Sequence, residues 1–138
     1  DYPKEMMQQV KKELTKLEKL EGKKLGAIKN PLLVSVRSGA AQSMPGMMDT
    51  VLNLGMNDKS VLGFIEVTGN ARAGWDCYRR FIDMFGDVVM GPSSSLEHEH
   101  FEHAITAIKK KYKAKSDTDL TADQLKELVD EYKKIYKK

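Results

Sequence analysis

Near the start of the chain, hydrophobic and polar positions alternate with the spacing of a helix. In residues 1–20, apolar side chains recur every three or four positions between lysines and glutamates, at Met6, Val10, Leu14 and Leu17. This spacing predicts an amphipathic helix whose apolar side packs into a core. A basic helix lying on a membrane surface is the weaker alternative, because acidic residues are interspersed with the lysines.

Four further helices are predicted after residue 57. The first covers about residues 58–67 and ends at Gly69, and the next runs from its cap Asn70 over residues 70–90. The last two begin at capping boxes that start at Ser94 and Thr121. The expected inward side chains of the last three helices are Trp75, Tyr78, Ile82, Phe85 and Val89; Phe101, Ala104, Ile105, Ile108 and Tyr112; and Leu125, Leu128, Val129, Tyr132, Ile135 and Tyr136.

A short apolar run, residues 32–36, lies between the first two helices and predicts a buried strand. It delivers Arg37 into a loop of small and turn-forming residues, 38–46, after which residues 51–54 are a candidate second strand. A guanidinium offers a fixed fork of donors, and glycine leaves backbone amides open to an anion, so this pattern suits a phosphate. An ordinary turn is the competing interpretation. The pattern divides the chain into a strand-and-loop part, 1–56, and a helical subdomain, 57–138.

Composition and charge exclude several classes of protein. The 138 residues suit one folded unit with a real core, and 41% hydrophobic with 31% charged residues does not indicate disorder. A net charge of +3 is too small to argue for a nucleic-acid partner. No apolar run approaches the ~20 residues of a membrane span, and no signal peptide opens the chain. A single cysteine, Cys77, excludes an internal disulfide and fits a reducing compartment such as the cytoplasm.

A histidine-rich segment raises the question of a metal site. His100 and His103 could share one helical face with Glu97. Their spacing lacks the two histidines four residues apart that a zinc-binding helix uses, so surface histidines are the preferred interpretation. The glycines form neither a P-loop nor a dinucleotide fingerprint, and Cys77 is expected to be a buried thiol rather than a nucleophile.

Three strings in the sequence resemble the nucleotide-binding domain of pyruvate phosphate dikinases: VRSGA, SMPGMMDTVLNLG and DCYRRFIDMFGDVVM. The resemblance covers about residues 25–89 and, more loosely, both flanks. Related phosphoenolpyruvate synthases look similar at the strand end but carry a different loop, so MPGMMDT favours the dikinases. The resemblance implies an α+β, predominantly helical piece of an ATP-grasp-like domain, whose sheet is completed by chain beyond these residues.

The resemblance also implies site residues. Enzymes of this family convert ATP, phosphate and pyruvate to AMP, pyrophosphate and phosphoenolpyruvate. By the resemblance, Arg37, Ser38, Gly39 and Gly46 are expected to bind the phosphates of ATP, and a Met-lined flap is expected to close over them. Arg80 is expected to bind inorganic phosphate. Arg72 is a lesser candidate for the same electropositive surface. Without the resemblance, a solvated Arg80 is the preferred interpretation.

Further expectations concern cofactor and partners. Mg²⁺ accompanies ATP in this family, and its ligands are expected outside this chain. The expected partners are a phosphohistidine domain and a pyruvate-binding domain of a parent enzyme that forms a homodimer, in the cytoplasm or in an organelle. The chain alone is expected to be inactive. A free-standing interaction domain that reuses the loop without chemistry, and a piece of a phosphoenolpyruvate synthase, are the alternatives.

Overall fold

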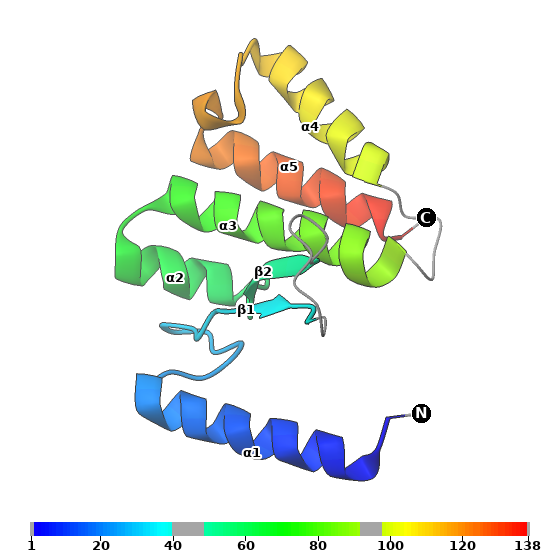
Figure 1. Cartoon of the computed structure of the whole chain (residues 1–138). Helices are drawn as coiled ribbons and strands as arrows, with labels where there is room; N and C mark the ends of the chain where they lie inside the picture. Colours follow the sequence, from blue (N-terminus) through cyan, green and yellow to red (C-terminus); the bar gives the residue numbers. More distant parts are fainter. Residues whose placement is uncertain (1, 40–48, 92–97, 138) are drawn as a thin grey trace.

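A computed structural model describes residues 2–39, 49–91 and 98–137 (Figure 1). Helices dominate, and one pair of short strands lies near the middle of the chain, as the sequence predicts. The elements are α1 (Lys4–Glu21), β1 (Val34–Arg37), β2 (Thr50–Leu54), α2 (Ser60–Thr68), α3 (Ala71–Met84), the π-helix η1 (Phe85–Met90), α4 (His98–Tyr112), the 3₁₀ turn η3 (Asp117–Asp119) and α5 (Ala122–Ile135). No helix of the described residues is both long and apolar enough to cross a membrane.

Strands β1 and β2 form a two-stranded antiparallel sheet. Arg37 pairs with Thr50 across the sheet, and an irregularity interrupts the register between Val34 and Val36. Both predicted strands are therefore confirmed. The predicted burial of the first is confirmed only at Leu32, because β1 pairs with β2 alone and Val36 is 51% exposed.

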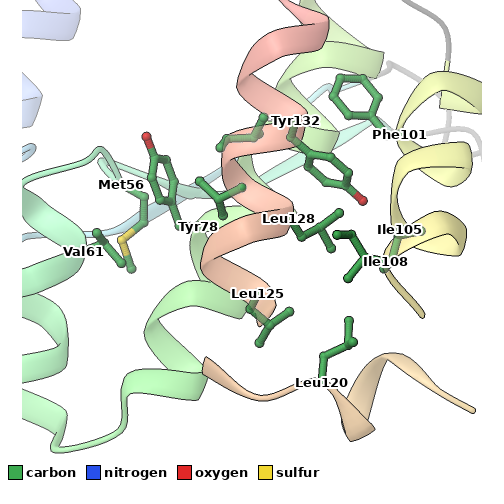
Figure 2. Packing of buried hydrophobic residues seen from close by; sticks show 12 residues of the cluster. Met56, Val61, Tyr78, Phe101, Ile105, Ile108, Leu120, Leu125, Leu128 and Tyr132 are labelled. Atoms are coloured by element: carbon green, nitrogen blue, oxygen red, sulfur yellow. The ribbon is translucent and has the colours of Figure 1, made fainter. Parts of the chain in front are cut away.

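The core lies among α3, α4 and α5, with α2 and the end of the hairpin at its margin. Figure 1 shows α5 between α3 and α4, and all three helices contribute side chains to one apolar cluster (Figure 2). Phe101 meets Tyr132 edge to face at 5.0 Å, which is a favoured arrangement of aromatic rings. The cluster comprises Met56, Val61, Tyr78, Ile82, Phe101, Ile105, Ile108, Leu120, Leu125, Leu128, Val129 and Tyr132.

The predicted helix ends are largely confirmed. Asn57 Oδ1 accepts from the backbone amide of Ser60 at 2.8 Å ahead of α2, and Asn70 Oδ1 accepts from Ala73 at 2.9 Å at the start of α3. Gly69, with φ of 65°, ends α2. The capping box at Thr121 forms as expected. The predicted box at Ser94 lies outside the described residues.

Two predicted inward positions are wrong. The helix begun at α3 continues as a π-helix from Phe85, and the longer π turn shifts the apolar stripe so that Val89 points to solvent. Tyr112 lies at the end of α4 and is also exposed, because its hydroxyl donates to a carboxylate oxygen of Glu127 rather than entering the core. The remaining positions in these stripes are buried or half-buried.

The prediction that α1 packs into the core is also wrong. None of its residues is buried, and Val10, in the middle of the apolar stripe, is 52% exposed. Figure 1 shows α1 standing apart from the helices that make the core. The amphipathic pattern predicted the helix correctly, but no other described element covers its apolar side.

Candidate functional site

Arg37 is the last residue of β1, at the end of the hairpin where the strand leaves the sheet. Its side chain is exposed, and it forms no hydrogen bond or ion pair with any residue that the structure describes. An arginine held in an internal ion pair would have fewer donors left for a ligand. No described residue uses any of the five N–H donors of the Arg37 side chain.

Ser38 and Gly39, the first residues of the loop, directly follow Arg37. The Ser38 amide donates to the carbonyl oxygen of Asp49 at 2.9 Å, and the Ser38 hydroxyl donates to the same oxygen at 3.4 Å, closing the described end of the hairpin. Gly39 is open on its described side, since no described atom lies within 4 Å of the place where a Cβ would sit. Gly46 and the Met-lined flap lie in residues 40–48, outside the described residues.

The hairpin is placed by α3. The Asn53 side chain on β2 donates a 3.2 Å hydrogen bond from Nδ2 to the carbonyl oxygen of Cys77 on α3. β2 also touches η1, the continuation of that helix. The element that presents Arg37 and the helix that presents Arg80 therefore pack together, although no described contact joins the two arginines.

Two neighbouring arginines of α3 have different surroundings. Arg80 is 52% exposed, and its Nε lies 3.0 Å from Oδ2 of Asp76. The Arg79 side chain is only 8% exposed, and its Nη2 lies 2.8 Å from Oδ1 of the same carboxylate. Arg80 is therefore solvated, as the sequence pattern without the resemblance predicts, whereas Arg79 is buried.

Burial of Arg79 was not predicted, because arginine is seldom buried without a partner. Burial of its guanidinium opposes the charge, but the hydrogen bond and negative charge of Asp76 outweigh this effect and raise the pKa of Arg79 above its ordinary value. Asp76 is the residue that the sequence analysis missed. Its spacing of three and four residues before two arginines on one helix was the available signal.

Arg72 has a structural role in the described part of the chain. Its Nε donates to the carbonyl oxygen of Leu120 at 3.0 Å, and its Nη2 donates to that of Asp117 at 3.1 Å. These bonds tie the start of α3 to the connection before α5. The hydrogen bonds of Arg72 therefore favour a structural role for this residue over a role in ligand binding.

The titratable groups elsewhere on α3 give no sign of a nucleophile or metal centre. Burial and the nearby charge of Asp76 raise the pKa of the half-buried Cys77 thiol, which keeps it protonated. Within residues 2–39, 49–91 and 98–137, no group of three or more possible ligands could hold a metal ion. The described residues therefore do not fit a Mg²⁺ site of their own, and Glu97 of the histidine-rich segment lies outside them.

Two surface pockets lie away from both candidate arginines. One, of about 360 Å³, lies between the end of α1, residues 30–34 and α2, and includes Leu17 and Phe64. The other, also of about 360 Å³, lies between α3 and the end of α5, and includes Tyr78 and Tyr136. Neither of these two pockets includes Arg37 or Arg80.

Comparison of the sequence with known proteins identifies its relatives. No protein-family model matches the chain. The chain is 55% identical over 134 residues to the pyruvate, phosphate dikinase of Giardia intestinalis, covering 97% of this chain and 15% of that protein. It is 55% identical over 133 residues to the enzyme of Clostridium symbiosum, covering 96% and 15%. It is 48% identical over 134 residues to the chloroplastic pyruvate, phosphate dikinase 1 of Arabidopsis thaliana, covering 97% and 13%.

These matches extend well beyond residues 25–89, where the motifs lie, and they include α1 and the last two helices. The chain spans about 15% of the length of the first two relatives. At this identity over almost its whole length, the chain belongs to the pyruvate, phosphate dikinase family, and it corresponds to one segment of such an enzyme.

Proposed function

We propose that this chain is the part of a pyruvate, phosphate dikinase that contacts the phosphates of ATP and the inorganic phosphate. In this proposal Arg37, Ser38, Gly39 and Gly46 contact ATP, and Arg80 holds the attacking phosphate. The parent reaction converts ATP, phosphate and pyruvate to AMP, pyrophosphate and phosphoenolpyruvate. The dikinase names of the relatives support this enzyme over a phosphoenolpyruvate synthase.

The state of Arg37 carries the proposal. An exposed guanidinium with no described partner, at the end of a strand and beside an open glycine, can present paired N–H donors to phosphate oxygens. Phosphoryl transfer depends mainly on positioning and on neutralising charge at the transferred group. An arginine at a strand end can supply both without taking part in covalent chemistry.

The other parts of the reaction belong to the remainder of the parent enzyme. In this proposal, Mg²⁺ bound with ATP takes its protein ligands from outside this chain. The phosphohistidine domain, the pyruvate-binding domain and the homodimer contact would also lie elsewhere. An ATP-grasp-like sheet would then extend the two strands of this chain.

The experiment that tests the proposal is Arg37→Ala in the full-length enzyme. We expect a loss of about 100-fold or more in the nucleotide half-reaction, the size that follows removal of a donor to developing charge. The pyruvate half-reaction should stay within about twofold of wild type, because a separate domain performs it. Lys29→Ala, which removes another exposed cation near the hairpin, is the matched control and should leave both halves unchanged.

Equal loss of both half-reactions in Arg37→Ala would show that the arginine stabilises the enzyme and does not bind nucleotide. Arg37→Lys separates charge from geometry, since lysine keeps the charge and loses the fork of donors. We also expect this chain alone to bind ATP weakly and to catalyse nothing. Sub-micromolar binding of ATP to the isolated chain, measured by calorimetry, would contradict the proposal that part of the ATP site lies elsewhere in the parent enzyme.

A further inference from the structure

We propose that Asp76 is a positioning residue that aims Arg80 at inorganic phosphate, and that buried Arg79 neutralises Asp76 so that Arg80 keeps its charge for the ligand. This inference rests on the proposed function of Arg80. It assigns roles to two residues, Asp76 and Arg79, to which the sequence analysis gave none.

The first step is the division of one carboxylate between two arginines. Oδ1 of Asp76 accepts from Nε and Nη2 of Arg79, at 3.1 and 2.8 Å. Oδ2 lies 3.0 Å from Nε of Arg80. Each carboxylate oxygen therefore serves a different guanidinium, and Asp76 cannot turn without breaking one of the two contacts.

The second step concerns what remains free on Arg80. The contact of Arg80 with Asp76 uses Nε, and the Arg80 side chain is 52% exposed. The two terminal nitrogens carry four further N–H donors, which this contact does not use. Phosphate accepts two parallel hydrogen bonds from such a pair. The Asp76 contact thus fixes the plane of the guanidinium and leaves its ligand-binding edge available.

The third step concerns charge. A carboxylate paired with Arg80 alone would cancel the charge that attracts phosphate. Arg79 supplies a second cation to the same carboxylate, and together the three side chains retain one positive charge, at the exposed guanidinium. Arg79 also lies 4.0 Å from a carboxylate oxygen of Asp117, at the limit of an ion pair. The pKa of Arg79 is raised despite its burial, so it remains a cation.

An ordinary helix-surface ion pair is the competing explanation. Such pairs, three or four residues apart, are exposed to solvent and contribute little to stability. Asp76 differs because its side chain is only 14% exposed and is held from the other side by Arg79, which is itself buried. The carboxylate is therefore fixed before Arg80 meets it, as a positioning group requires.

The test measures steady-state kinetics of the full-length enzyme carrying Asp76→Asn, which keeps the size of the side chain and removes its charge. We expect the KM for inorganic phosphate to rise about tenfold, the effect of losing a hydrogen bond to a charged group. The KM for ATP and the pyruvate half-reaction should stay within about twofold. Glu131→Gln, which removes an exposed carboxylate that pairs with Lys134 on α5, is the control and should change nothing.

Arg80→Ala distinguishes failure of this inference from failure of the proposed function. If Arg80→Ala raises the KM for phosphate and Asp76→Asn does not, Asp76 has no positioning role and the phosphate assignment of Arg80 stands. If Arg80→Ala leaves that KM unchanged, the phosphate assignment fails, and the inference fails with it. Equal increases in the KM values for ATP and phosphate in Asp76→Asn would show general damage and overturn the inference.

Asp76→Asn leaves the buried Arg79 without its partner, which can prevent folding. The double variant Asp76→Asn with Arg79→Met removes both charges and fills the same space. Its phosphate KM should also rise about tenfold. A double variant with wild-type phosphate KM would contradict the inference, whether or not the single variant folds.

Discussion

Asn53 joins the hairpin to α3, because its Nδ2 donates a 3.2 Å hydrogen bond to the carbonyl oxygen of Cys77. Asn53 has a φ of 58°, in the left-handed region that asparagine tolerates better than most residues. The left-handed backbone conformation and the side-chain hydrogen bond therefore both favour asparagine at position 53. Through this bond, the strand that pairs with Arg37 is held against the helix that carries Arg80.

Asn53→Ala should lower the free energy of unfolding by about 2 kcal/mol, from the lost hydrogen bond and the cost of a left-handed alanine. Urea unfolding of this chain measures the change. Asn53→Gly is the matched variant, because glycine accepts this φ and loses only the bond. If the two variants are equally stable, backbone conformation contributes nothing at this position.

The buried carboxylate of Asp83 should make stability depend on pH. Burial raises its pKa above the ordinary value, and the charges of His98 and Arg79 oppose that rise without reversing it. Oδ1 of Asp83 is buried without a hydrogen-bond partner in the described residues, and Nδ1 of His98 is 3.4 Å away. Because the folded state favours the protonated acid, the contribution of Asp83 to stability is full at low pH and is lost as pH rises through its raised pKa.

Asp83→Asn is uncharged at every pH, so it should melt at a higher temperature than wild type near about pH 7 and lose this advantage near about pH 3. Thermal unfolding followed by circular dichroism measures both. The comparison is repeated in a His98→Gln background to remove the neighbouring imidazole. An Asp83→Asn variant that is less stable than wild type near neutral pH would show that the ion pair outweighs burial.

The sequence predicted the helices and both strands because their signals are local. Caps at Asn70 and Thr121 and apolar spacing along α5 act within a few residues, and the structure reproduces them. The environment of a helix is not local. α1 has a clear apolar stripe, yet what covers such a stripe depends on segments far away in the chain, and no described element covers it.

The candidate site was predictable only in part. Arg37 at a strand end and Arg80 off the apolar stripe both follow from local pattern, and the structure exposes both. The roles of Asp76 and Arg79 depend on side-chain geometry, because spacing permits the ion pairs but does not show which arginine is buried. Composition favoured a solvated arginine, and the shared carboxylate is what allows Arg79 to enter the core.

Gly63 should be intolerant of any side chain for a steric reason. A Cβ there would lie 1.8 Å from the carbonyl oxygen of Ile28, so α2 rests directly on the backbone of the segment before β1. Gly63→Ala should cost about 1–3 kcal/mol or more, since backbone must move. Gly22→Ala is the control: Gly22 has a φ of 63° but open space around it, so only about 1 kcal/mol of conformational strain is expected. The urea midpoints of the two variants show which is less stable. A smaller loss of stability in Gly63→Ala than in Gly22→Ala would contradict the close contact between α2 and the backbone of Ile28.

The uncovered side of α1 should tolerate charge in this chain. Val10 is 52% exposed in the middle of the apolar stripe, so Val10→Glu removes no buried contact and should change the free energy of unfolding by less than about 0.5 kcal/mol. Leu128, fully buried on α5, provides the contrast, and Leu128→Ala should cost about 2–5 kcal/mol because it leaves a cavity. Both are measured by urea denaturation followed by tryptophan fluorescence, since Trp75 on α3 packs against the core. A loss above about 2 kcal/mol in Val10→Glu would mean that the stripe is covered in solution.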